Sequence, residues 1–222
     1  MVGKLFDYEE CYDRFEFVQA KIQSLVHDRL RDKYGFQQIA VAQNQGTSAP
    51  AGGEYHRFPQ IFVSPDIHTN TTVLVLVPKV GDEAPGQWDR AMFTSGERGN
   101  ILFASQFPYI DMALNQGWGV VLCDPNGGDV HDSDEYRQSH ILYVWDDILR
   151  PSQAKCVMYV ALGEGTDAVL SILDSSRADE FRQRVKGVAL LDGTNGDKWK
   201  EKLDRAWLNK PQTNTNWFRD MR

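Results

Sequence analysis

The sequence predicts an α/β fold, a three-layer sandwich with a mostly parallel central sheet. Three observations predict it. Apolar runs rich in β-branched residues recur along the chain, as is typical of strands buried on both faces. Helix-like segments, with apolar residues every three or four positions, separate these runs. Finally, the stretch CVMYVALGEGTDAVLSIL (Cys156–Leu173) joins a strand to a helix through a glycine-rich turn.

Length and composition favour one domain over residues 1–222. The chain has 222 residues, 41% of them hydrophobic, which suffices for the core of a single large α/β unit. We expect an N-terminal helix and loop, residues 1–58, to pack on this unit, and residues 193–222 to form a polar C-terminal segment. The net charge is −7 and Lys and Arg form no long run, so direct nucleic-acid binding is disfavoured.

In the N-terminal third, the residue pattern predicts one helix and three strands. Residues 14–33 repeat apolar side chains at spacings of three and four, and Gly35 is a stop signal for this helix. The strand candidates are Gln38–Gln43, Gln60–Ser64 and the β-branched run Thr72–Pro78. A loop rich in Gly, Ser and Pro separates the first two strands.

Helices and strands alternate along the rest of the chain, which places helices on both faces of a parallel sheet. The predicted helices are Phe107–Gln116, Ser139–Arg150 with Ser139 as its N-cap, and Thr166–Ser176. The predicted strands are Trp118–Pro125, Lys155–Leu162 and Val185–Asp192. Residues 126–138 read as a polar loop, and the C-terminal segment holds one helix-like patch, Asp197–Leu208.

The glycine-rich turn has the pattern of a nucleophile elbow without a nucleophile. In α/β-hydrolases the motif G-x-S-x-G places a serine between strand and helix, and the catalytic acid and histidine follow it in the chain. Here the turn reads Leu162, Gly163, Glu164, Gly165 and Thr166, with Gly163 at the apex. Thr166 falls in the first helical turn, where a hydroxyl serves as a capping group.

The catalytic base is missing as well. The five histidines are His27, His56, His68, His131 and His140, so none follows the elbow. Two absences of different kinds, the nucleophile and the base, argue against a serine triad. The sequence therefore predicts a protein that is not an enzyme.

Metals and cofactors are not indicated either. Cys11, Cys123 and Cys156 lack metal-type spacing and are expected to be reduced thiols, in keeping with a nuclear or cytoplasmic protein. His131 lies in the run Asp129–Glu135, which we interpret as a solvated acidic loop. The N-terminus lacks the apolar core of a secretory signal, and no run is long enough to cross a membrane.

Five residues are candidates for binding. Asp124 follows the apolar run WGVVLC, where a carboxylate faces the ligand crevice of a parallel sheet. Asp192 ends the last predicted strand, at the position of a triad acid, but has no histidine to orient. For Asp124 a turn-forming role before Pro125 is the alternative. Glu164 lies in the elbow, where its carboxylate either is exposed or hydrogen-bonded nearby, or contacts a basic side chain of a partner. Trp207 and Trp217 lie in the polar C-terminal segment, and exposed tryptophans are typical of protein interfaces.

Pieces along almost the whole chain resemble the Arb2 domain family, named for a second argonaute-binding protein. The most telling are Gln87–Trp88, Pro108–Tyr109–Ile110, Asp124–Pro125–Asn126 and Tyr143–Val144–Trp145–Asp146, in this order and spacing. The family includes proteins related to the family-with-similarity-172 group and a domain attached to some fungal class II histone deacetylases. The resemblance implies an α/β-hydrolase-like fold.

The sequence departs from the catalytic pattern that some members of that family keep. Pro78 and Lys79 stand where the resemblance places a His-Gly oxyanion loop, and Gly163 stands where it places the serine. Residues 193–195, Gly-Thr-Asn, replace a Ser-Val-His segment. The resemblance thus implies a non-catalytic interaction scaffold in RNA silencing, heterochromatin or messenger-RNA regulation. Its partner would be an argonaute-associated or histone-deacetylase-type subunit, or a second copy of the chain.

Two alternatives stay open. One is a serine hydrolase with a non-standard site, in which Ser105 pairs with His131 or His140. The other is a module that binds a small ligand or an RNA end in the former catalytic pocket. Glu164, Asp124 and Asp192 would make the mouth of that pocket acidic, which disfavours phosphate ligands.

Overall fold

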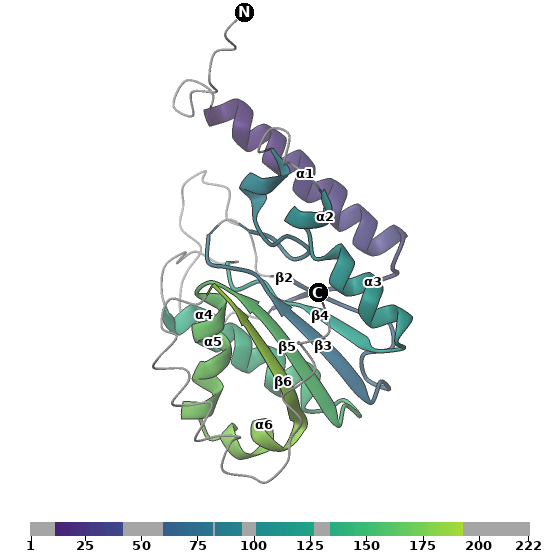
Figure 1. Cartoon of the computed structure of the whole chain (residues 1–222), viewed down its shortest axis with the longest axis vertical. Helices are drawn as coiled ribbons and strands as arrows, with labels where there is room; N and C mark the ends of the chain where they lie inside the picture. Colours follow the sequence, from purple (N-terminus) through teal and green to yellow (C-terminus); the bar gives the residue numbers. More distant parts are fainter. Residues whose placement is uncertain (1–11, 42–59, 82, 95–100, 127–133, 193–222) are drawn as a thin grey trace, which may run out of the picture.

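The structure of the protein is a computed structural model, which describes residues 12–41, 60–81, 83–94, 101–126 and 134–192 (Figure 1). Within these residues the strands form one six-stranded sheet of order β1-β2-β4-β3-β5-β6. The strands are β1 (Gln37–Ala40), β2 (Gln60–Val63), β3 (Thr72–Val77), β4 (Gly119–Leu122), β5 (Cys156–Leu162) and β6 (Val185–Leu191). Each predicted strand is confirmed, with ends that shift by three residues or fewer.

The sheet is mostly parallel, as predicted. Strands β3, β4, β5 and β6 pair in parallel, whereas β2 runs antiparallel to both β1 and β4. Parallel neighbours bring their carboxyl ends to the same edge of the sheet. The carboxyl ends of β3, β4, β5 and β6 therefore lie at one edge.

Helices cover both faces of the sheet, which confirms the three-layer α/β architecture (Figure 1). One face carries α1 (Tyr12–Asp32) and α3 (Phe107–Asn115), and the other carries α4 (Asp134–Tyr143), α5 (Gly165–Ser171) and α6 (Ala178–Arg184). Strand β3 shows why both faces need cover. Its Val73, Val75 and Val77 join the core under α4 and α5, while Leu74 and Leu76 join the core under α1 and α3.

The helix after β4 differs from the prediction. It begins at Asp134, so the second half of the predicted loop is helical and Ser139 lies inside α4 rather than at its N-cap. Asp134 and Glu135 occupy the first turn, where carboxylates stabilise the helix dipole. The last part of the predicted helix, Val144–Leu149, is π-helical (η3).

Three short helices were not predicted: η1 (Arg90–Phe93), α2 (Ile101–Ala104) and α6. The predicted helix Thr166–Ser176 ends as a short 3₁₀ turn, η4 (Ile172–Asp174). The helix-like patch Asp197–Leu208, Trp207 and Trp217 lie outside the described residues. The extension of a single domain over residues 1–222 stays a prediction.

Asn126 fixes the loop that follows β3. Its Nδ2 donates to the carbonyl oxygens of Lys79 (2.9 Å) and Glu83 (3.0 Å), and its Oδ1 accepts from the amide of Gly81 (3.1 Å). The side chain is only 4% exposed. Because Asn126 follows β4, these bonds tie together the loops at the ends of two neighbouring strands.

Gly165 fixes the distance between that loop and the elbow. A Cβ atom at Gly165 would lie 2.5 Å from the carbonyl oxygen of Pro78 and 3.1 Å from a methyl group of Val77. The first contact is with backbone, which yields only if β3 or α5 moves. Glycine is therefore required where α5 starts against the end of β3.

We expect Asn126→Ala to lower the free energy of unfolding by about 2–4 kcal/mol, because it leaves three backbone groups of the loop without their partner. Urea denaturation measures this loss. The control is Asn70→Ala, which removes an exposed hydrogen bond to Asp66 and is expected to cost less than about 1 kcal/mol. Equal losses in the two variants would contradict the role given to Asn126.

We expect Gly165→Ala to lower the free energy of unfolding by about 1–3 kcal/mol, since the added methyl group overlaps the carbonyl oxygen of Pro78. The matched control is Gly187→Ala in β6. There a Cβ atom would meet only Met158 at an ordinary 3.8 Å, so a change below about 0.5 kcal/mol is expected. A Gly165→Ala protein as stable as the control would show that the elbow does not need this close approach.

Candidate functional site

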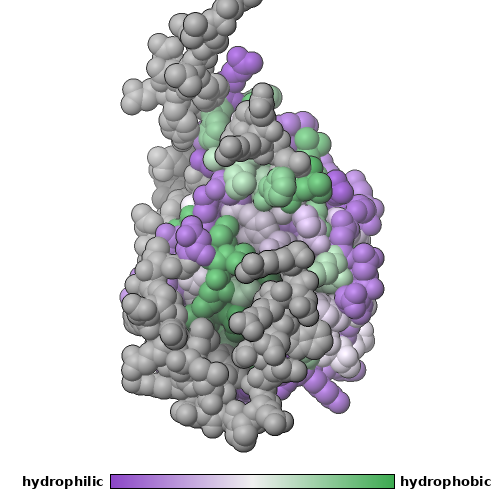
Figure 2. Space-filling model, in the orientation of Figure 1, coloured by the Kyte–Doolittle hydropathy of each residue, from purple (hydrophilic) through white to green (hydrophobic). Residues whose placement is uncertain are grey.

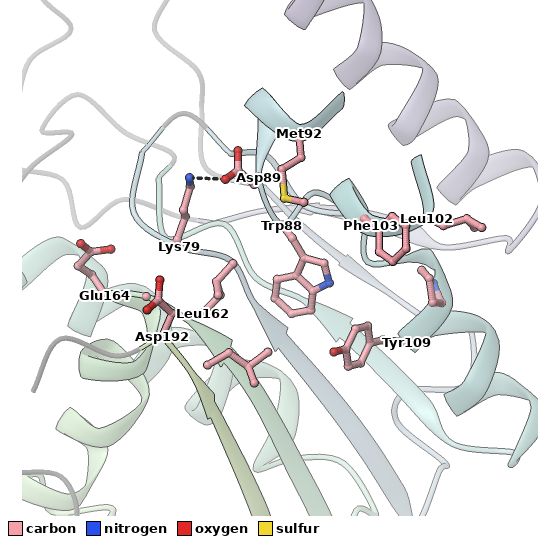
Figure 3. A pocket seen from close by; sticks show the side chains of 13 residues that line it. Lys79, Trp88, Asp89, Met92, Leu102, Phe103, Tyr109, Leu162, Glu164 and Asp192 are labelled. Carbon is pink, nitrogen blue, oxygen red and sulfur yellow. Dashed lines mark hydrogen bonds and ion pairs between the residues drawn. The ribbon is translucent and has the colours of Figure 1, made fainter. Parts of the chain in front are cut away.

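A pocket of about 830 Å³ opens at the carboxyl ends of β3, β5 and β6 (Figure 3). We call it the elbow pocket. Its strand-end wall consists of Lys79, Leu162, Gly163, Glu164, Leu191 and Asp192. Its cap wall consists of Trp88, Asp89, Met92, Leu102, Phe103, Pro108 and Tyr109, from η1, α2, α3 and the residues beside them. In a parallel sheet this edge is where ligands bind.

The turn between β5 and α5 keeps the shape of an elbow. Gly163 has a φ of +55°, in the left-handed region that favours glycine. Its amide donates to the carbonyl oxygen of Leu191 (2.8 Å), which ties the turn to the end of β6. Thr166 is fully buried, and its hydroxyl donates to the carbonyl oxygen of Gly163 (2.7 Å). As predicted, the hydroxyl of Thr166 stabilises the first turn of the helix.

Lys79 stands where the oxyanion loop was expected, and its charge is neutralised. The Nζ atom lies 2.8 Å from Oδ2 of Asp89 and 3.5 Å from Oε1 of Glu83. Burial opposes the charged form of Lys79, but the hydrogen bond to Asp89 and the two carboxylate charges outweigh it and raise its pKa. Burial raises the pKa of Glu83, even though Lys79 acts in the opposite direction.

Asp89 joins this ion pair to η1. Burial would raise the pKa of Asp89, but the hydrogen bond and charge of Lys79 outweigh burial and lower it. Its Oδ1 accepts from the amide of Ala91 (2.9 Å), so Asp89 caps η1. The next residue, Arg90, lies 3.3 Å from Glu16 on α1. Two ion pairs, Lys79–Asp89 and Arg90–Glu16, thus connect the pocket to the N-terminal helix through the adjacent residues Asp89 and Arg90.

The cap wall is aromatic and partly open to solvent. Trp88 and Tyr109 pack edge to face, with ring centroids 5.4 Å apart. Leu102 and Phe103, both on α2, are 56% and 68% exposed. Figure 2 shows apolar surface above and below a paler region on this face of the molecule.

The mouth of the pocket is acidic on the opposite wall. Glu164 and Asp192 are both exposed, and Figure 3 shows them close together beside the elbow. Neither carboxylate has a cation within 4.0 Å among the described residues. Asp192 has a φ of +52°, which makes it the one non-glycine residue of the described ranges with a positive φ. Aspartate tolerates this conformation better than most residues do.

Asp124 does not join these two carboxylates. It is 1% exposed and lies outside the pocket lining. Its Oδ2 accepts from the amide of Gln60 (3.0 Å), and its own amide donates to Nε2 of His140 (2.9 Å). Asp124 therefore holds β2 and α4 to the end of β4, which is a structural role like the alternative considered from the sequence.

Ser105, the candidate nucleophile of the alternative hydrolase site, also has hydrogen-bond partners within the protein. Ser105 is fully buried, and its hydroxyl donates to the carbonyl oxygen of Ile101 and accepts from the amide of Phe107 (3.4 Å). Nε2 of His140 accepts a hydrogen bond from the backbone amide of Asp124 and not from Ser105. His131 lies outside the described residues. Among the described residues that line the elbow pocket there is no Ser, Thr, Cys or His.

The described residues hold no group of three or more His, Cys, Asp or Glu side chains arranged for a metal. Cys123 is buried and Cys156 half-buried, both are free thiols, and burial raises the pKa of each. Cys11 lies outside the described ranges. None of the helices that the structure describes combines the length and the apolar composition needed to cross a bilayer.

Sequence reasoning missed most of the cap wall. Trp88 and Tyr109 were singled out as parts of two telling motifs, but not as neighbours in a pocket. Met92, Leu102 and Phe103 were not selected, because η1 and α2 are too short to produce a periodic pattern. A signal was present in residues 101–103, Ile-Leu-Phe, an apolar triplet inside a long polar connection.

The comparisons with known proteins agree with this fold. The Arb2 domain model matches residues 7–132 and 128–218. A FAM172 family protein homolog of Caenorhabditis elegans is 32% identical over 136 residues, which cover 60% of this chain and 42% of that protein. The human cotranscriptional regulator ARB2A is 22% identical over 268 residues, which cover 92% of this chain and 62% of that protein. The chain thus spans about half the length of these relatives.

The fold is also similar to that of a solved structure. The histone deacetylase Clr3 superposes with a TM-score of 0.51 at 17% identity, over 78% of this chain and 26% of that one. At this identity the likeness concerns the fold. Taken with the family match over nearly its full length, the findings show that the chain belongs to the Arb2 domain family.

Proposed function

We propose that this chain is a non-catalytic protein-interaction scaffold that serves in a gene-regulatory complex. The observation that carries the proposal is the elbow, which keeps its backbone shape but presents Gly163 in place of a nucleophile. The pocket lining adds support, since its described residues include no serine, threonine or cysteine nucleophile and no histidine base.

The geometry around Gly163 also disfavours any side chain at the apex. A Cβ atom there would lie 3.1 Å from Cβ of Lys79, so that Lys79 would have to move by a few tenths of an ångström. Lys79 is itself held in place by Asp89 and Glu83. The space beside the apex of the elbow is thus bounded by Lys79, whose side chain is held by two carboxylates.

The regulatory part of the proposal rests on the relatives. Proteins of Dictyostelium discoideum, chicken, mouse and human that match this chain are named as cotranscriptional regulator ARB2A or its homolog. The structural neighbour Clr3 is a histone deacetylase. We infer a nuclear subunit of a chromatin or transcript-processing assembly, whose partner is a protein. RNA silencing and heterochromatin are the settings that we favour within that class.

We expect no labelling of the purified chain by a fluorophosphonate probe, because Ser105 is buried and its hydroxyl is engaged by backbone groups. In-gel fluorescence and intact mass measure the labelling. A known serine hydrolase is the positive control, and Ser105→Ala is the matched variant. Labelling of the wild-type chain that disappears in Ser105→Ala would overturn the non-catalytic assignment.

We expect the tagged chain to recover a protein partner reproducibly from nuclear extract after mild crosslinking, in a ratio near one to one. Light scattering on the eluted material gives the mass of the complex, and that of the chain alone tests for a dimer. A chain that stays strictly monomeric and recovers no reproducible partner from nuclear or cytoplasmic extract would contradict the scaffold role.

A further inference from the structure

We propose that the elbow pocket receives a basic, apolar-anchored segment of a partner protein, with a Lys or Arg side chain directed at Glu164 and Asp192. The proposal rests on the scaffold function proposed above and names the chemistry of its partner. Three independent features of the pocket carry it: its apolar rim, its charge and its shape.

The rim gathers exposed apolar side chains. The described residues include eight large hydrophobic side chains that are exposed. Four of them line this pocket: Met92 (38% exposed), Leu102 (56%), Phe103 (68%) and Leu191 (38%). A cluster of this kind around a cavity is typical of an interaction site rather than of ordinary surface.

The charge of the pocket selects a cation. Asp89 and Glu83 neutralise Lys79, the one ammonium group of the described lining. Glu164 and Asp192 then remain as exposed carboxylates without a cation among the described residues. Two carboxylates at a pocket mouth that no described cation neutralises attract a cation and repel phosphate or an acidic peptide.

The shape suits a long side chain better than a flat surface contact. A volume of about 830 Å³ is enough for one or two large side chains. The rings of Trp88 and Tyr109 lie across the pocket from the acidic mouth (Figure 3). Lys and Arg carry apolar stems that pack on such rings while their charged ends reach a carboxylate.

A second copy of the chain fits this pocket less well than a basic partner. The chain carries a net charge of −7, so two copies repel each other at long range. The described residues of the rim on both walls are apolar or acidic, apart from Lys79, whose charge Asp89 and Glu83 neutralise. Self-association through this face would therefore place carboxylates near carboxylates.

The test uses the 222-residue chain and three fluorescein-labelled twelve-residue peptides in a fluorescence-polarisation titration. The first alternates Lys and Leu. In the second Glu replaces every Lys, and in the third Ser replaces every Leu. We expect saturable binding of the first peptide, with a Kd at least about tenfold lower than for either of the others. Raising the salt concentration is expected to weaken this binding.

Matched variants locate the binding. Glu164→Gln combined with Asp192→Asn is expected to raise the Kd of the Lys-Leu peptide about fivefold. Phe103→Ser is expected to raise it about fivefold or more, as for an interface anchor. The controls are Asp134→Asn combined with Asp179→Asn, at carboxylates 81% and 92% exposed elsewhere, and Phe17→Ser on α1, where the phenylalanine is 73% exposed. The controls should change the Kd less than about twofold.

Equal affinity for the Lys-Leu and Glu-Leu peptides, or equal losses in the test and control variants, would overturn the proposal. So would a concentration-dependent dimer that Phe103→Ser dissolves, since a second copy would then occupy the pocket. The outcome is separable from the scaffold function. If Phe103→Ser keeps the partner captured from nuclear extract, the scaffold survives and this pocket is not its docking site.

Discussion

The close approach of the elbow to the end of β3 is the constraint on which the rest of this site depends. Gly165 can begin α5 where it does only because it has no Cβ atom to meet the carbonyl oxygen of Pro78. The contact sets the distance between two neighbouring strand ends, and Thr166 then stabilises the turn from its own side. Asn126 holds the loop after β3 from the other side, so the floor of the pocket is fixed at three points.

The ion pair of Lys79 follows from that placement. The residue leaves β3 beside Gly163, and its Nζ atom reaches Asp89 at the start of η1. The same short helix then connects to α1 through Arg90 and Glu16. The cap wall is thus attached to the sheet by an ion pair in addition to the apolar core, in which Trp88 packs with Leu74 and Leu76 of β3. An ionic attachment of this kind is worth little per pair at the surface. The position of Trp88 is also set by its packing in the core and by the hydrogen bond from its amide to the carbonyl oxygen of Ala104 (2.7 Å).

The sheet was predictable from the sequence because buried parallel strands leave long apolar runs, as Thr72–Val77 and Cys156–Leu162 do. The turn between β5 and α5 was predictable too, because the fixed spacing of the elbow motif identifies Gly163 as the residue at its apex. The cap wall was not, since a four-residue helix such as α2 has no period to detect. Asp124 illustrates a third limit. A carboxylate after a strand faces a crevice or the interior according to the neighbouring loops, which the local sequence does not specify.

The charges that line the pocket favour the binding of a cation over acyl transfer. An acyl-transfer site surrounds its reacting carbonyl with donors, because negative charge develops on that oxygen in the transition state. In this pocket Asp89 and Glu83 neutralise the one described ammonium group, and Glu164 and Asp192 add negative charge beside the elbow. Such a field raises the energy of an oxyanion and lowers that of a bound cation. The exposed carboxylates of Glu164 and Asp192 beside the elbow are therefore the reason for which we propose that this pocket recognises a Lys or Arg side chain of a partner.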